Sequence, residues 1–235
     1  MIYIPKGSCP KALIDYKKKP GANYDFDGDT TNAKEQWRNC LLEEQGYLCA
    51  YTMMQIKYGF TKENTRTVRL EHLERQNNTK RDLKHSNVVA VCHGNDGKEP
   101  KHQYADVRKK CSDLDRRLHP TNKDCEKYIK YQPDGKIYSE ECVLDRQLSD
   151  WLDSRNILRH SVLNLNYQEL LDARVGAYKA VKNKIIKSEN KLSEIKKLIK
   201  SFQVKDSDGK LKPYCGYILY HLRKELHQQK KLKNE

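Results

Sequence analysis

The sequence predicts an α+β fold that is mainly helical, and three patterns support this prediction. A helix start signal lies near residue 32, short apolar runs between polar loops fill residues 47–120, and long amphipathic patterns follow from residue 143. The 235 residues are enough to bury a core without disulfides, although only 37% are hydrophobic and 33% are charged. We therefore expect a folded chain with much solvated surface.

The N-terminal region, residues 1–46, is expected to be a helical segment. Asn32 is suited to cap a helix, Glu35 stands three residues later, and Trp37 follows at helical spacing. Gly46 is expected to end this helix, because glycine tolerates the backbone conformation found just past a helix.

The central region, residues 47–120, reads as short strands and turns around a site. Its apolar runs at residues 67–70 and 87–91 are short and bounded by polar residues, which favours strands over helices.

The region 121–235 is expected to be helical, basic and partner-binding. Asp134 and Gly135 predict a hairpin turn, since Asp-Gly tolerates positive φ angles. Residues 143–157 are amphipathic, and Asn166 with Glu169 resembles a helix cap. Five apolar residues then recur at spacings near those of a heptad: Val181, Ile185, Leu192, Ile195 and Ile199. They predict one long basic helix. The simpler expectation is that this helix packs on the protein's own core, and the alternative is a coiled coil.

The charge of the chain indicates a polyanionic partner. The formal net charge is +14, and most of the excess lies beyond Leu171. Lysine and arginine contacts that release counterions drive binding to nucleic acid. The 15 tyrosines against 3 phenylalanines also suit stacking on bases. A solvated basic face and tyrosine packing against a protein partner remain the simpler alternatives.

No targeting signal is apparent in the sequence. The N-terminus lacks the apolar segment of a signal peptide, and no stretch approaches the roughly 20 apolar residues of a membrane-spanning helix. We expect a cytoplasmic protein without a membrane partner, in which the 8 cysteines are reduced and serve packing or metal binding.

Three residues in the central region suit phosphodiester hydrolysis, which needs a base for water and a cation on the phosphate. His72 is suited as the base, because neutral imidazole accepts a proton near neutral pH. Glu71 and Asp106 offer the hard oxygen ligands that Mg²⁺ or Mn²⁺ prefers. On a regular strand Glu71 and His72 face opposite sides, so the strand must end or twist there.

Other residues are expected to support these three. Asn87 is expected to accept a hydrogen bond from the His72 imidazole and fix its tautomer. Arg108 and Lys109 follow Asp106 within one helical turn and are expected to hold the flanking phosphates.

The order Glu71-His72, Asn87, Asp106 and Lys109 resembles the ββα-metal motif of HNH endonucleases, with Asp106 in place of the last histidine. Further segments, up to about residue 180, are similar to the PtuB-like HNH proteins of Septu-type and retron-linked anti-phage systems. They are Met1-Ile2-Tyr3-Ile4-Pro5-Lys6-Gly7, Lys18-Lys19-Pro20-Gly21-Ala22, the run from Leu41 to Tyr51, Gly135-Lys136-Ile137 and Leu163-Asn164-Leu165-Asn166.

The resemblance implies a small ββα HNH nuclease core, over residues 47–120, embedded in a mainly helical protein. It also implies partners: an ABC-type ATPase of the PtuA kind and, in retron-linked systems, a reverse transcriptase with its RNA–DNA product. The implied role is that of a nuclease effector of antiviral defence.

The resemblance further implies a structural zinc ion held by two pairs of ligands, of which this chain keeps half. Cys49 and Cys92 match, whereas Thr52 and Ala105 occupy the other two places. Two residues nearby, His93 and His102, are candidates to replace them. Loss of the zinc, with packing in its place, is the alternative.

Two functional hypotheses follow. The first is an HNH endonuclease that cleaves DNA or RNA, including a structured RNA such as tRNA. The second is a catalytically degenerate subunit that binds nucleic acid or serves as a scaffold.

Overall fold

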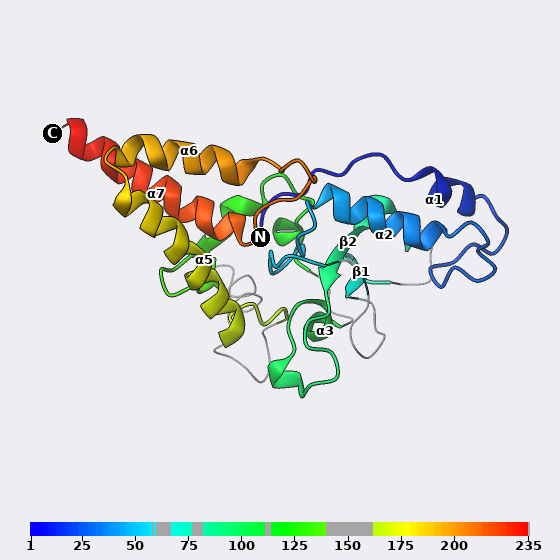
Figure 1. Cartoon of the computed structure of the whole chain (residues 1–235). Helices are drawn as coiled ribbons and strands as arrows, with labels where there is room; N and C mark the ends of the chain where they lie inside the picture. Colours follow the sequence, from blue (N-terminus) through cyan, green and yellow to red (C-terminus); the bar gives the residue numbers. More distant parts are fainter. Residues whose placement is uncertain (58, 60–66, 77–81, 111–113, 140–161, 235) are drawn as a thin grey trace.

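The computed structural model describes residues 1–57, 59, 67–76, 82–110, 114–139 and 162–234 (Figure 1). The described part combines helices with a few short strands, so the α+β class is confirmed. The predicted amphipathic segment at 143–157 lies outside the described residues.

Helices α1 (Lys11–Tyr16) and α2 (Ala33–Glu44) form the N-terminal part and pack on each other. The predicted cap of α2 is wrong: Asn32 has a left-handed backbone and makes no side-chain cap. Instead, the Asp29 carboxylate accepts from the Ala33 backbone N–H at 2.6 Å. The helix ends before Gly46, whose φ of +57° fits the predicted stop.

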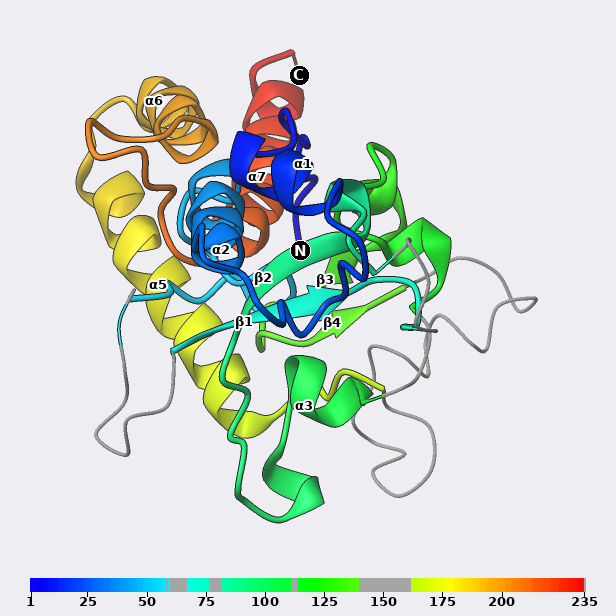
Figure 2. The same ribbon diagram turned by 90° about the vertical axis from the view of Figure 1, so that its right-hand side faces the viewer.

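The two predicted central strands are confirmed as an antiparallel pair. Strand β1 spans Val68–His72 and β2 spans Val88–Cys92, in a register that sets His72 opposite Val88. A 3₁₀ turn, His85–Asn87, leads into β2. Helix α3 (Ala105–Lys109) packs on one side of this pair and α2 on the other (Figure 2).

The predicted Asp134-Gly135 turn is confirmed. It joins the two-residue strands β3 (Lys130–Tyr131) and β4 (Ile137–Tyr138), and Gly135 has a φ of +89°. Three further 3₁₀ turns occur in the described chain, at Pro100–His102, Arg116–Leu118 and Cys125–Tyr128.

The C-terminal region forms three packed helices where the sequence predicts one: α5 (Gln168–Lys187), α6 (Lys191–Gln203) and α7 (Cys215–Asn234). The near-heptad residues are divided between α5 and α6, because Asn190 caps α6 by accepting from the Ser193 N–H at 3.0 Å. Asn166 does not cap α5. Its amide instead bonds both backbone groups of Ile137.

Buried apolar side chains from all three regions form one continuous core. Trp37 of α2 is fully buried against Tyr24, Phe26 and His85, and truncating such a side chain costs about 3–5 kcal/mol. Within the described chain, no helix combines the length and apolar character needed to cross a bilayer.

Candidate functional site

A cavity of about 560 Å³ follows the free edge of β1. Because β1 pairs only with β2 among the described strands, all five of its residues border this cavity. Glu71 and His72, which are adjacent in sequence, both border the cavity, and β1 ends at His72. The residues that line the cavity are Tyr24, Lys34, Arg38, Val68, Arg69, Leu70, Glu71, His72, Gln76, Asp96, Asp106 and Lys110.

Glu71 is held by a buried cation. Its Oε1 lies 2.8 Å from the Lys109 ammonium and 3.3 Å from the Tyr51 hydroxyl, which donates to it. Lys109 also donates to the His72 carbonyl at 2.9 Å. Burial raises the pKa of Glu71, although Lys109 opposes this shift. Lys109 is 3% exposed and does not line the cavity, so in this structure its ammonium pairs with Glu71 and does not face the space in which a substrate phosphate is expected.

Asp106 is a buried carboxylate with one unused oxygen. Its Oδ2 lies 3.0 Å from the Arg69 guanidinium, whereas its buried Oδ1 has no hydrogen-bond partner. Burial raises the pKa of Asp106 to about 7, and the nearby Glu71 adds to the effect against Arg69. An unpaired buried carboxylate oxygen is costly, which makes this atom suited to a cation.

Burial lowers the pKa of the His72 imidazole, which favours its neutral form. The ring is also in T-shaped contact with Tyr24, at 4.5 Å between centroids. Its Nε2 lies 2.8 Å from the Asp82 carbonyl. A carbonyl only accepts, so Nε2 carries the proton and Nδ1 keeps the lone pair of a base.

Asn87 does not make the predicted contact with His72. Its Oδ1 accepts from the Glu74 N–H at 2.8 Å, and its Nδ2 donates to the Glu74 carbonyl at 3.2 Å. Asn87 thus fixes the chain just past His72, and the Asp82 backbone fixes the imidazole. Arg108 also lies outside the cavity lining and donates to the Pro100 carbonyl at 3.2 Å.

The candidate zinc ligands do not assemble into a group. Cys49 and Cys92 are free cysteines whose thiols lie close enough to interact, and Thr52 Oγ1 lies 3.8 Å from Cys92 Sγ. His102 contacts the Tyr167 hydroxyl at 3.2 Å, so it faces the start of α5. Within the described part of the chain, these cysteines form no three-ligand cluster with His93 or His102. Ala105 is buried at the start of α3 and offers no ligand.

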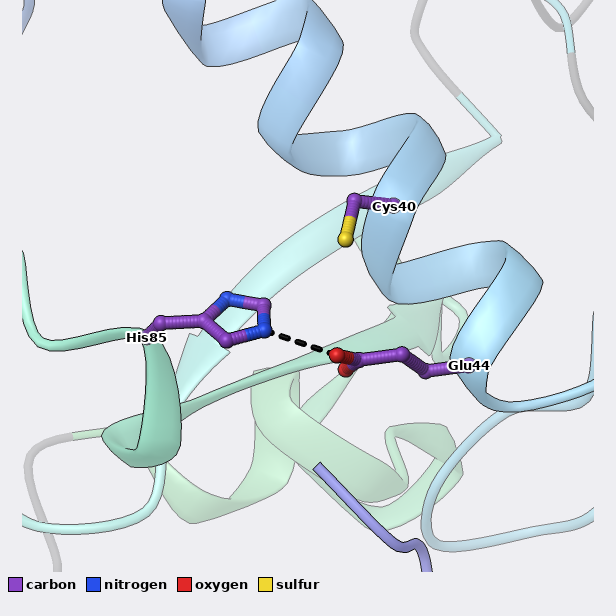
Figure 3. Close-up of side chains that lie close together, drawn as sticks. All are labelled: Cys40, Glu44 and His85. Carbon is purple, nitrogen blue, oxygen red and sulfur yellow. Dashed lines mark hydrogen bonds and ion pairs between the residues drawn. The ribbon is translucent and has the colours of Figure 1, made fainter. Parts of the chain in front are cut away.

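A different candidate metal-ligand group lies between α2 and β2. Ligand atoms of Cys40, Glu44 and His85 lie within 4.8 Å of one another (Figure 3). No sequence motif predicts this group. Cys40 and Glu44 share a helix face at a spacing of four, but 41 residues separate Glu44 from His85.

Hydrogen bonds already use the Glu44 and His85 atoms of this group. The Trp37 indole donates to His85 Nδ1 at 2.9 Å, so Nε2 carries the proton and donates to Glu44 at 2.7 Å. Lys6 pairs with the other Glu44 oxygen at 2.6 Å. A cation bound to His85 Nε2 requires the tautomer that carries its proton on Nδ1. That proton would then face the Trp37 indole N–H, so that two donors would meet. This network therefore fits α2 to the start of β2 without a metal.

Comparisons with known proteins add no assignment: no protein-family model matches the chain, and no curated protein matches it significantly.

Proposed function

We propose that this chain is a metal-dependent HNH endonuclease that hydrolyses phosphodiester bonds in the cavity along β1. The observation that carries the proposal is the meeting of His72, Glu71 and Asp106 in one cavity, with a buried oxygen of Asp106 left without a partner. These are the base and the oxygen ligands that such hydrolysis needs.

His72 acts as the general base in this proposal. Its Nδ1 lone pair takes the proton of the attacking water, and the bond from Nε2 to the Asp82 carbonyl keeps the ring in that tautomer. The lowered pKa of His72 keeps the base neutral at physiological pH.

Glu71 and Asp106 would hold the cation. Their donor set fits Mg²⁺ or Mn²⁺, because both offer carboxylate oxygens and Asp106 Oδ1 is not otherwise used. When bound, the ion supplies charge stabilisation on the scissile phosphate and its leaving oxygen. The pairs Glu71–Lys109 and Asp106–Arg69 neutralise the two carboxylates without it.

The biological setting that we propose follows the PtuB-like resemblance. The chain would be the nuclease effector of a cytoplasmic anti-phage complex with a PtuA-like ABC-type ATPase, and in a retron-linked system with a reverse transcriptase and its RNA–DNA product. DNA and RNA, including tRNA, both fit, because attack by water needs no 2′-hydroxyl.

The test is cleavage of pooled cellular DNA and RNA by the purified chain, alone and with its ATPase, in Mg²⁺, Mn²⁺ or EDTA. We expect metal-dependent cleavage that falls at least about 100-fold in His72→Ala, since general-base catalysis contributes about that much. His227→Ala, an exposed histidine on α7, is the matched control and should cut like the parent. Equal cleavage by a folded His72→Ala variant would refute the assignment.

A second candidate function is a catalytically degenerate subunit that binds nucleic acid or acts as a scaffold. The buried Lys109 favours it, because its ammonium already occupies Glu71 where a cation would bind. This alternative predicts no cleavage with any metal and salt-sensitive binding that survives His72→Ala.

A further inference from the structure

The cavity along β1 is lined by several charged side chains. Most of them are paired: Glu71 with Lys109, and both Asp96 and Asp106 with Arg69. A polyanion entering the cavity therefore finds these groups already compensated.

Lys34 is different. It belongs to α2, outside the HNH resemblance, and its side chain is half-buried in the cavity wall. Its ammonium lies 4.7 Å from the centre of the Tyr24 ring and donates to the Tyr24 carbonyl at 3.3 Å. No carboxylate oxygen of the described residues lies within 4.0 Å of it.

The position of Lys34 places this charge beside the proposed base. The Tyr24 ring that carries the ammonium is the ring in contact with His72. The charge of Lys34 is also near enough to His72 to disfavour its protonation. Lys34 thus lies near the point at which the scissile phosphate must be presented to the base.

Lys110 offers a second such charge. It is exposed, lines the same cavity just after α3, and has no carboxylate partner among the described residues. Helices α2 and α3 lie on opposite sides of the β1–β2 pair (Figure 2), so Lys34 and Lys110 approach the free edge of β1 from different elements.

We propose that Lys34, with Lys110, binds phosphodiester oxygens of a nucleic-acid strand laid along the free edge of β1. The assignment rests on the proposed function for its site, and it adds α2 to the substrate-binding elements. Two ammonium groups without carboxylate partners are suited to phosphate, whose contacts position the strand and carry no sequence information. Lys34 then presents the backbone to His72.

The test is equilibrium binding, which does not require cleavage. The full-length His72→Ala chain is titrated against fluorescein-labelled 20-nucleotide DNA and RNA at several salt concentrations. Lys34→Gln, which keeps a hydrogen-bond donor, is then added to this background. We expect affinity for at least one oligonucleotide to fall about 5- to 10-fold, and the log–log salt slope to decrease by about one. Lys34→Arg should retain binding within about twofold of the parent.

Lys11→Gln is the matched control, because Lys11 is an exposed lysine of α1 that does not line the cavity. Thermal unfolding of each variant separates binding from packing. Unchanged affinity in Lys34→Gln, equal losses in Lys11→Gln, or no oligonucleotide binding by the His72→Ala chain would each overturn the proposal. If binding depends on Lys34 but the parent chain does not cleave, the Lys34 proposal is supported and only the nuclease function is refuted.

Discussion

His72 and its neighbours show how burial sets the chemistry of single residues. Burial lowers the pKa of His72 and raises that of Asp106, so both shifts favour the neutral forms. The sequence identified these residues from their types and order. The residue types did not predict that the Asp82 carbonyl holds the imidazole ring, because every residue has a backbone carbonyl.

The pH dependence of cleavage follows from His72. The pKa of His72 is lowered from its ordinary value of 6.5, so the imidazole is deprotonated at a lower pH than usual. The rate should therefore rise with pH and level off before pH 6.5. The measurement is kcat/KM from pH 5 to 8 at saturating Mn²⁺, which keeps Asp106 ionised. A rate that still rises tenfold per pH unit above pH 7 would exclude His72 as the titrating base.

Lys109 should matter for stability through Glu71. Replacing it in Lys109→Met leaves the half-buried Glu71 carboxylate without its cation, so the free energy of unfolding should fall by about 3 kcal/mol. Urea unfolding at pH 7.5 measures this. Lys110→Met, at the exposed neighbouring position, should change it by less than about 0.5 kcal/mol. Equal stability of Lys109→Met and the parent would show that the ion pair is dispensable.

At the scale of elements, turns and strands were easier to predict than caps. The β1 and β2 runs and the Asp134-Gly135 turn depend on local residue types, and the structure has them. The caps at Asn32 and Asn166 failed because tertiary contacts took over: Asp29 caps α2, and Asn166 bonds Ile137 across the fold.

Helix α3 is a second element in which tertiary packing decided the role of a residue. From the sequence, Lys109 lies within one helical turn of Asp106, and its ammonium is expected to hold a flanking phosphate. Because α3 has only five residues and packs on β2, the face that carries Lys109 points inward, and Lys109 meets Glu71 instead of solvent. Helical spacing alone does not tell which face is buried.

Gly94 fixes the approach of α3 to β2. Its φ is +60°, and an added Cβ would lie 2.3 Å from the Tyr104 carbonyl oxygen. Gly94→Ala should therefore lower the free energy of unfolding by about 3 kcal/mol, from backbone strain plus the clash. Gly97→Ala is the control: φ is +82°, but nothing lies within 4 Å, so only the strain of about 1 kcal/mol applies. Equal losses in urea unfolding would show that the close contact is unimportant.

At the scale of the whole molecule, the site depends on parts of the chain that no local motif connects. The cavity along β1 takes its walls from α2, the segment around Tyr24 and the end of α3. The sequence predicted the three residues proposed for chemistry and the fold class. It did not predict Lys34 or the Cys40–Glu44–His85 group, since both depend on how α2 packs against the strand pair.

The same packing explains how a half-complete zinc set is accommodated. The free thiols of Cys49 and Cys92 lie close together, and both residues pack in the core that also includes side chains of the C-terminal helices. Cys92 pairs with Val68 at the start of β1, whereas His72 ends that strand.

The central claim is that His72 activates water at a phosphodiester bond. The most direct measurement is the chemical identity of the ends that the wild-type chain, with its ATPase, produces on RNA in Mn²⁺, compared with His72→Ala. The account predicts ends formed by water, without 2′,3′-cyclic phosphate, in the wild type and no such ends in His72→Ala. Cyclic phosphate ends, or the same ends in the variant, would contradict it.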